Sequence, residues 1–174
     1  MRIIHLIIFS TVLLFGCNSC TEKREITEDD VAAIQKDMIA ESKKQHEQEI
    51  KEIDHYIRKQ KWPMEQTPTG LRYWIYEKGQ GKQVKNDDVA FISYKITLLD
   101  ETLCYETTEA EPKRVLVGHD NVETGLHEAL QLMHVGDRAK FILPSHLAFG
   151  FTGDSGKIPQ NASVVYDIKL IAAE

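Results

Sequence analysis

The spacing of apolar residues in the first third of the chain is helical. Residues 27–61 contain neither Pro nor Gly, and Thr27 precedes three acidic residues, as at the start of many helices. Apolar residues recur every three or four positions near both ends of this segment: Val31, Ile34 and Met38, then Ile50, Ile53 and Ile57. Residues 42–48 are polar on every side, so we predict a long helix whose ends can pack while its middle is solvated.

Two interpretations of the 27–61 helix remain open. It can serve as a stalk, or as a helix for homodimerisation, that holds a folded domain away from an anchor. It can also lean partly on its own domain, since three Ile residues lie near its end. We favour the stalk.

Beyond Leu71 the period changes from helical spacing to two. Alternation of apolar and polar residues predicts strands at 71–76, 89–99, 113–117, 138–143 and 163–171. Residues 123–133 alone return to helical spacing, and Gly136 ends that segment. Short alternating strands with one short helix predict an α+β domain over residues 69–174, in which a curled antiparallel sheet packs on the helix.

The N-terminus has the features of an export signal. Arg2 precedes an apolar run over residues 3–15, which is too short to span a bilayer as a mature helix. The run ends in Leu14-Phe15-Gly16-Cys17, which resembles the lipobox of bacterial lipoproteins, where the peptidase cuts before an acylated cysteine. We therefore expect a signal peptide at 1–16, a lipid anchor on Cys17 and a tether at 17–26. An ordinary secretory signal is the alternative.

A lipid on Cys17 would place the protein in the cell envelope. Asn18 gives no inner-membrane retention signal of the enteric type, so we expect the outer membrane, facing the periplasm, with surface display as the alternative.

Composition narrows the possible functions. The chain has 174 residues, 42% of them hydrophobic and 28% charged, which suits one globular domain with a tail. A net charge of −6 disfavours binding to nucleic acid. The three Cys and seven His residues show no metal-ligand spacing, so no metal site and no cofactor are expected. The motif Gly153-Asp154-Ser155-Gly156 looks like a serine-protease nucleophile site but lacks placed partners.

A specific signature lies in the C-terminal half. Its linked blocks are Val122-Glu123-Thr124-Gly125-Leu126, Val135-Gly136-Asp137-Arg138, Pro144 to Gly150, Ile158-Pro159 and Val164 to Leu170. In this order they resemble the FKBP family of peptidyl-prolyl cis-trans isomerases, from about Thr69 to the end. With the long helix and the lipobox-like segment, the chain further resembles FKBP lipoproteins, including the type associated with gliding motility.

The resemblance implies a hydrophobic pocket between the sheet and the helix. Carried over by position, the catalytic residues are Tyr94, Phe149, Ile158 and Tyr166, and the substrate-binding residues are Val122, Glu123 and Leu126. The backbone N–H of Glu123 would contact a ligand carbonyl. Taken one at a time, Leu126 and Tyr166 fit plain core packing equally well.

The isomerisation of a peptidyl-prolyl bond that the resemblance implies needs no nucleophile, metal or cofactor. Amide resonance sets a barrier of about 20 kcal/mol to rotation of the peptide bond. An apolar site favours the less dipolar twisted amide, and oriented donors can hold its carbonyl. The implied partners are unfolded or proline-containing exported proteins.

Several positions depart from the family pattern. The family usually has Phe-Asp where this chain has Cys104-Tyr105, and an apolar residue where it has Lys157. A pocket Phe aligns with Lys113, a Trp with Leu126, and a pocket Tyr with Phe149. We predict an isomerase; the alternative is a noncatalytic FKBP-like lipoprotein that acts as a chaperone or binds an envelope partner.

Overall fold

The computed structural model describes residues 27–174 of the chain. The chain divides after Ile39, and the sheet belongs to the unit that begins at Ala40. The expected signal peptide, Cys17 and the tether up to residue 26 lie outside the described residues. Within 27–174, no helix combines the length and the apolar character needed to cross a membrane.

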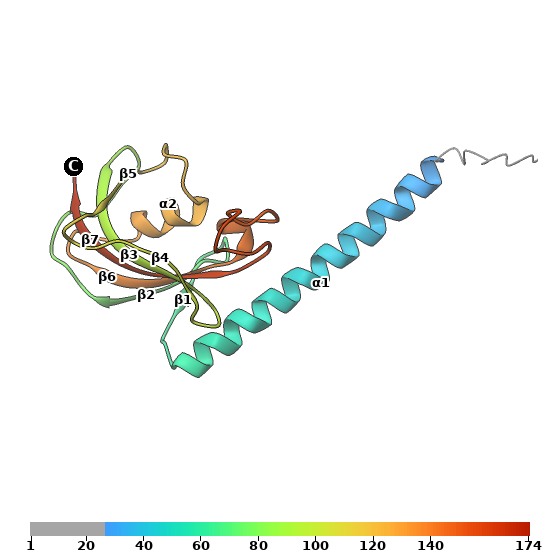
Figure 1. Ribbon diagram of the computed structural model, residues 1–174, viewed down its shortest axis with the longest axis horizontal. Coiled ribbons are helices and arrows are strands. Elements are labelled where there is room, and N and C mark those ends of the chain that lie inside the picture. Colours follow the sequence, from blue (N-terminus) through green and yellow to red (C-terminus); the bar gives the residue numbers. More distant parts are fainter. Residues whose placement is uncertain (1–26) are drawn as a thin grey trace, which may run out of the picture. The chain divides into compact units, whose positions relative to one another are not determined.

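The sheet is antiparallel throughout and curls around one short helix (Figure 1). Its strands are β1 (Glu65–Gln66), β2 (Arg72–Glu77), β3 (Val89–Leu98), β4 (Leu103–Glu106), β5 (Lys113–Leu116), β6 (Arg138–Leu143) and β7 (Val164–Ala173). The spatial order is β1-β2-β6-β7-β3-β4, and β5 also pairs with β3. The helices are α1 (Glu28–Gln60), α2 (Thr124–Gln131) and the 3₁₀ helix η1 (Ser145–Leu147). The predicted fold class is confirmed.

The five predicted strands all form, with ends within about two residues of the expected ones. Two short strands were not predicted. β1 has two residues, and β4 has one buried residue, Cys104, between exposed neighbours, so neither carries enough alternation to be recognised.

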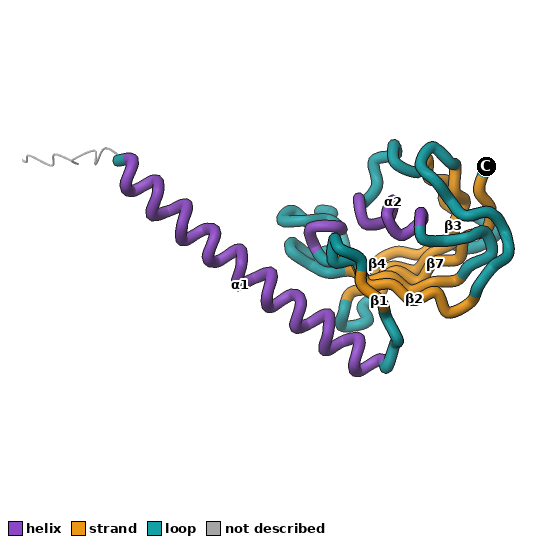
Figure 2. The backbone as a smooth tube through the Cα atoms, turned by 180° about the vertical axis from the view of Figure 1, so that it is seen from behind, coloured by secondary structure: helices purple, strands orange, loops and turns teal. Residues whose placement is uncertain are grey.

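Helix α2 lies inside the curve of the sheet, as Figures 1 and 2 both show. Its buried face contributes Leu126, Ala129 and Leu130 to the main core. Gly125 lets it approach closely, because a Cβ there would lie 2.8 Å from Leu143 Cδ2 and from the Leu147 carbonyl oxygen. A side chain at 125 would push α2 away from β6 and η1.

The other face of the sheet is covered by the last turns of α1. Ile53 is 0% exposed and Tyr56 is 6% exposed, and they pack with Ile142 and Val165 in a second apolar cluster. The C-terminal part of α1 therefore leans on its own domain, as the second interpretation of the helix expected. Residues 42–48 are exposed, as the polar pattern predicted.

This second cluster changes the environment of β2. Alternation placed Arg72 on the polar face, yet it is 7% exposed. Its guanidinium forms an ion pair with Asp54 of α1 at 3.3 Å and donates to the Gly70 carbonyl at 2.9 Å. The polar face is covered locally by α1, so the arginine is buried with its charge paired.

Candidate functional site

The six apolar residues assigned to the pocket all belong to the main apolar core or pack against it. Leu126, Ile158 and Tyr166 belong to the buried core, and Tyr94, Val122 and Phe149 are partly exposed and pack against that core. We call these six residues the site cluster. The rings of Tyr94 on β3 and Tyr166 on β7 lie 5.9 Å apart between centroids. The cluster thus combines three buried residues with three that are partly exposed.

The N-terminus of α2 is held at the edge of this cluster by a histidine. His127 Nδ1 accepts the Gly118 N–H at 2.9 Å, so Nε2 carries the proton and donates to the Asp120 carbonyl at 3.0 Å. Both ring nitrogens are satisfied, and the loop that carries Val122 is fixed to the helix. His127 therefore has a structural role.

Glu123 caps α2 and offers an unused donor. Its carbonyl accepts the N–H of Leu126 at 2.9 Å, as a residue at the start of a helix does. Within residues 27–174, no acceptor lies in hydrogen-bond range of the Glu123 N–H. This N–H is the group expected to contact a ligand carbonyl.

The electrostatics of the site favour uncharged groups. Burial, together with the nearby charge of Glu123 and a hydrogen bond to its carboxylate, raises the pKa of Tyr166 well above its ordinary value. Burial and the charge of Glu123 also raise the pKa of Tyr94. Both phenols stay protonated at neutral pH and can act as hydrogen-bond donors.

Three positions that depart from the family pattern, Cys104, Tyr105 and Lys157, are neighbours on β4 and the η1–β7 loop. Cys104 is 0% exposed, and burial, together with the charge of Asp154, raises the pKa of its thiol. Tyr105 is exposed, and its hydroxyl donates to Asp154 Oδ2 at 2.5 Å. The Nζ of Lys157 lies 5.3 Å from the centre of the Tyr105 ring. Tyr105 is thus tied to Asp154, which lies in the loop between η1 and β7.

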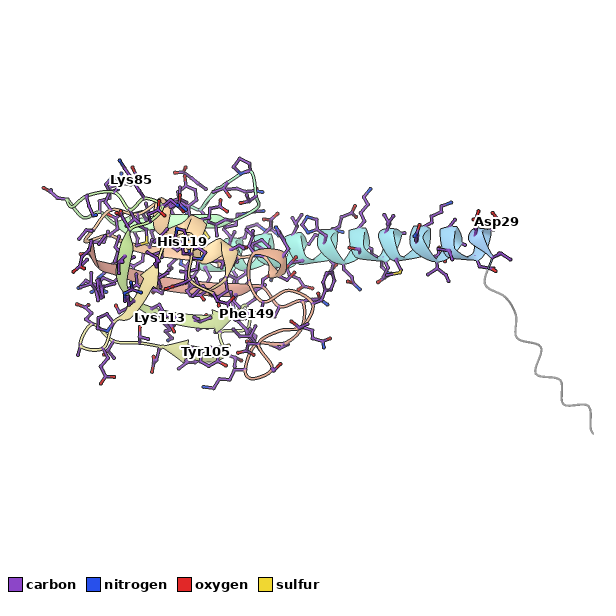
Figure 3. All side chains as sticks on the ribbon, turned by 90° about the horizontal axis from the view of Figure 1, so that it is seen from above. Asp29, Lys85, Tyr105, Lys113, His119 and Phe149 are labelled. Carbon is purple, nitrogen blue, oxygen red and sulfur yellow. The ribbon has the colours of Figure 1, made fainter. Side chains whose placement is uncertain are left out.

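Figure 3 labels Tyr105 on β4, Phe149 in the η1–β7 loop and Lys113 on β5. Lys113 is exposed at the start of β5, where it pairs with Ile92, and it is not part of the site cluster. The aromatic residue that the family places there has no counterpart at this position.

Asp154 was not predicted as a site residue. Its Oδ1 accepts the N–H groups of Gly156 and Ile158, each at 2.8 Å, so the carboxylate shapes the turn that brings Ile158 into the cluster. Burial raises the pKa of Asp154, but hydrogen bonds from Tyr105 and from these backbone groups outweigh it and the pKa is lowered. The sequence Asp154-Ser155-Gly156 is typical of such a turn, and this signal could have identified the residue.

A hollow of about 750 Å³ lies elsewhere, between residues 41–52 of α1, Leu98–Asp100 and 161–163. Most of the residues that line it are charged or amide residues of α1. It lacks the aromatic walls that grip a proline ring by area and shape, so the site cluster is the better candidate.

Comparison with known proteins points to one family. The family of FKBP-type peptidyl-prolyl cis-trans isomerases matches residues 80–171. A probable FKBP-type isomerase named FkpA from Neisseria meningitidis is 36% identical over 105 residues, covering 60% of this chain and 38% of that protein. The outer membrane protein MIP of Legionella longbeachae is 33% identical over 107 residues, covering 62% of this chain and 46% of that protein. The matches thus span less than half the length of these relatives.

Solved structures show the same fold. The crystal structure of FkpA from Escherichia coli matches with a TM-score of 0.61 and 24% identity, covering 86% of this chain and 74% of that one. A peptidyl-prolyl cis-trans isomerase from Pseudomonas syringae matches with a TM-score of 0.63 and 24% identity, covering 74% of this chain and 95% of that one. Because the family match spans more than half of the sequence and includes the whole segment from α2 to β7 except its last residues, this chain belongs to the FKBP-type peptidyl-prolyl cis-trans isomerase family.

Proposed function

We propose that this protein catalyses the cis–trans isomerisation of peptidyl-prolyl bonds in exported proteins. The observation that carries the proposal is that six apolar residues from four segments belong to or pack against one core, next to the N–H of Glu123, which has no acceptor within residues 27–174. The cluster can take up a proline ring, and the N–H can hold the adjacent carbonyl while the amide twists in an apolar environment.

A protease-coupled or exchange-NMR assay with proline peptides tests the activity. We expect isomerisation above the uncatalysed rate. Phe149→Ala removes roughly 1.5–3 kcal/mol of apolar contact, and kcat/KM falls about tenfold or more. Phe151→Ala is the matched control, because Phe151 lies two residues away in the same loop but is 72% exposed. Equal losses of kcat/KM in both variants, or no loss in either variant, would contradict the assigned site.

The second candidate function is noncatalytic binding, as a chaperone or an envelope-partner module. Tyr105 and Lys157 support it, because both differ from the family pattern and Tyr105 contacts Lys157 and Asp154. A folded protein that binds proline peptides in NMR titrations without accelerating their isomerisation would favour this candidate.

We further propose attachment to the outer membrane through a lipid on Cys17. The sequence Leu14-Phe15-Gly16-Cys17 supports it, and so does the similarity to the outer membrane protein MIP of Legionella longbeachae. Mass spectrometry of the mature N-terminus should find an acylated Cys17, and Cys17→Ala should release the protein from membranes. An unmodified N-terminus in the membrane fraction would contradict it.

Membership of the gliding-motility type predicts that disruption of the gene impairs gliding.

Homodimerisation through the first part of α1 is a further proposal. Val31, Ile34, Met38 and Ile39 are 43%, 55%, 66% and 71% exposed, which is unusual for apolar side chains on one short stretch of helix. Light scattering should show a dimer that Ile34→Asp converts to a monomer. A monomeric wild-type protein would disprove it.

A further inference from the structure

Two histidines and a glutamate gather at a place remote from the site cluster. His46 and Glu49 lie one turn apart on α1, and His146 lies in η1. One potential ligand atom from each residue lies within 4.8 Å of the others. His46 Nδ1 is 3.9 Å from Glu49 Oε2, and the rings of His46 and His146 meet edge to face at 5.9 Å. All three residues belong to the unit that begins at Ala40.

Hydrogen bonds already orient two of the three side chains. His146 Nε2 lies 3.1 Å from the carbonyl oxygen of Thr69, which can only accept, so Nε2 carries the proton and Nδ1 has the free lone pair. Glu49 Oε1 accepts the Ser145 N–H and the Ser163 hydroxyl, each at 2.6 Å. These contacts engage Oε1 and leave Oε2 on the side of His46. Such outer partners are typical of metal-binding histidines and carboxylates.

The carboxylate of Glu49 also lacks a fixed cation. Its side chain is only 12% exposed, and among residues 27–174 the one basic group within ion-pair distance is His46. A largely buried carboxylate is costly without a positive partner. A bound cation would supply that charge.

The space beside the cluster can hold an ion and its water ligands. A hollow of about 180 Å³ is lined by the three residues and by Ser42, Gln45, Ser145, Phe151 and Asn161. A water molecule occupies about 30 Å³ in the liquid, so there is room for an ion with one or more waters.

We propose that His46, Glu49 and His146 bind a divalent transition-metal ion, with zinc as the best fit. Two imidazoles and one carboxylate are a donor set that zinc accepts, with water in the remaining position. Calcium and magnesium prefer oxygen ligands and are disfavoured here. Zinc bonds of about 2.0–2.1 Å require ligand atoms roughly 3.3 Å apart, so the side chains must close by small rotations. The side chain of His46 is 54% exposed and free to make that movement.

The bound ion would connect α1 to the β6–β7 connection. That connection begins with η1 and carries Phe149 and Ile158 of the site cluster. The inference does not depend on isomerase activity, because it rests on the ligands and their hydrogen bonds alone.

Zinc titration of the untagged, metal-stripped full-length protein in detergent, followed by calorimetry, tests the site. We expect one high-affinity ion per chain in a Cys17→Ser, Cys20→Ser background, which removes the thiols outside the described residues. His46→Gln, Glu49→Gln and His146→Gln should each weaken binding by more than about tenfold, and Ser163→Ala by about tenfold. Cobalt substitution should give the visible absorption of a four-coordinate site in the parent protein and not in the His variants.

The matched control is His55→Gln, since His55 is exposed on the same helix and is not part of the cluster. It should bind zinc as the parent protein does. Binding that is absent in the parent protein would overturn the proposal. So would binding that is unchanged in both His46→Gln and His146→Gln while circular dichroism shows both variants folded. Equal weakening by His55→Gln would also overturn it, because it would indicate dispersed surface binding.

Discussion

At the scale of the residue, Asp137 holds two loops through one buried carboxylate. It is 2% exposed, and its Oδ1 accepts the Gly79 N–H at 2.6 Å while its Oδ2 accepts the His134 N–H at 2.7 Å. These bonds join the turn before β6 to the segment after β2. The sequence offered Val135-Gly136-Asp137 as part of a family block but did not show which donors the carboxylate serves.

Asp137→Ala should be strongly destabilising. It leaves two backbone donors without their acceptor, at a cost of about 1–3 kcal/mol each. Asp137→Asn keeps one acceptor and should cost less. Urea unfolding measures both, with Asp37→Ala on the exposed surface of α1 as the control. A stability equal to that of the wild type for Asp137→Ala would contradict this role.

Tyr105 and Asp154 give a second prediction at this scale. In Tyr105→Phe, Asp154 loses the hydroxyl that donates to Oδ2, while Gly156 and Ile158 still donate to Oδ1. The turn should open more often, so amide hydrogen exchange at Gly156 and Ile158 should speed up severalfold, with little change in global stability.

Tyr73→Phe is the control for this change, because its hydroxyl donates to Glu65 at 2.7 Å, far from the η1–β7 loop along the chain. Exchange at Gly156 and Ile158 should stay at the wild-type rate in that variant. If both variants alter the loop equally, Asp154 does not depend on Tyr105.

At the scale of the element, α1 is one helix with two environments. Ile53 packs on β6 and β7 and is 0% exposed, whereas Ile34 is 55% exposed. Both residues fit the same helical pattern in the sequence. Only the sheet, which is assembled from residues 65–173, distinguishes them.

The two isoleucines make a matched test. Ile53→Ala should lower the free energy of unfolding by about 2–5 kcal/mol, because it leaves a cavity between α1 and the sheet. Ile34→Ala should change it by no more than about 0.5 kcal/mol. Urea unfolding at low protein concentration compares them without dimerisation. Similar losses would mean that both ends of α1 are equally packed.

At the scale of the whole molecule, packing keeps tyrosines protonated. Burial is the main cause of the raised pKa values of Tyr56, Tyr76, Tyr94 and Tyr166, which lie on α1, β2, β3 and β7. For Tyr76, burial and its hydrogen bond to Asp167 raise the pKa to about 12. An unfolded tyrosine ionises near pH 10.

The folded protein should therefore lose stability in alkali. Below about pH 10 the folded and the unfolded state both hold the phenolic protons, so the contribution of these tyrosines to stability is fully present. Above it the unfolded state binds fewer protons, so the free energy of unfolding falls as the pH rises towards 12. Urea unfolding between pH 8 and pH 11.5, with absorbance at 295 nm, measures the decline. Tyr76→Phe should make it shallower, and an identical slope would exclude Tyr76 as a contributor.

The sequence by itself determined the elements and the family. Alternation predicted five strands, helical spacing predicted α1 and α2, and linked motif blocks identified the family. The assignment of six apolar residues to the site stays a prediction. The elements and the family could be predicted because their signals are periodic or local. The buried face of each element can be read from the spacing of its own apolar residues.

Only the tertiary structure decided which surfaces meet. It buried Arg72 under α1, brought Asp154 to Tyr105, and placed His146 beside His46 and Glu49. Each of these contacts joins segments that are far apart along the chain, so no spacing in the sequence indicates it. The physical reason is that burial and charge pairing depend on the neighbours that the curled sheet and α1 supply, and those neighbours exist only after folding.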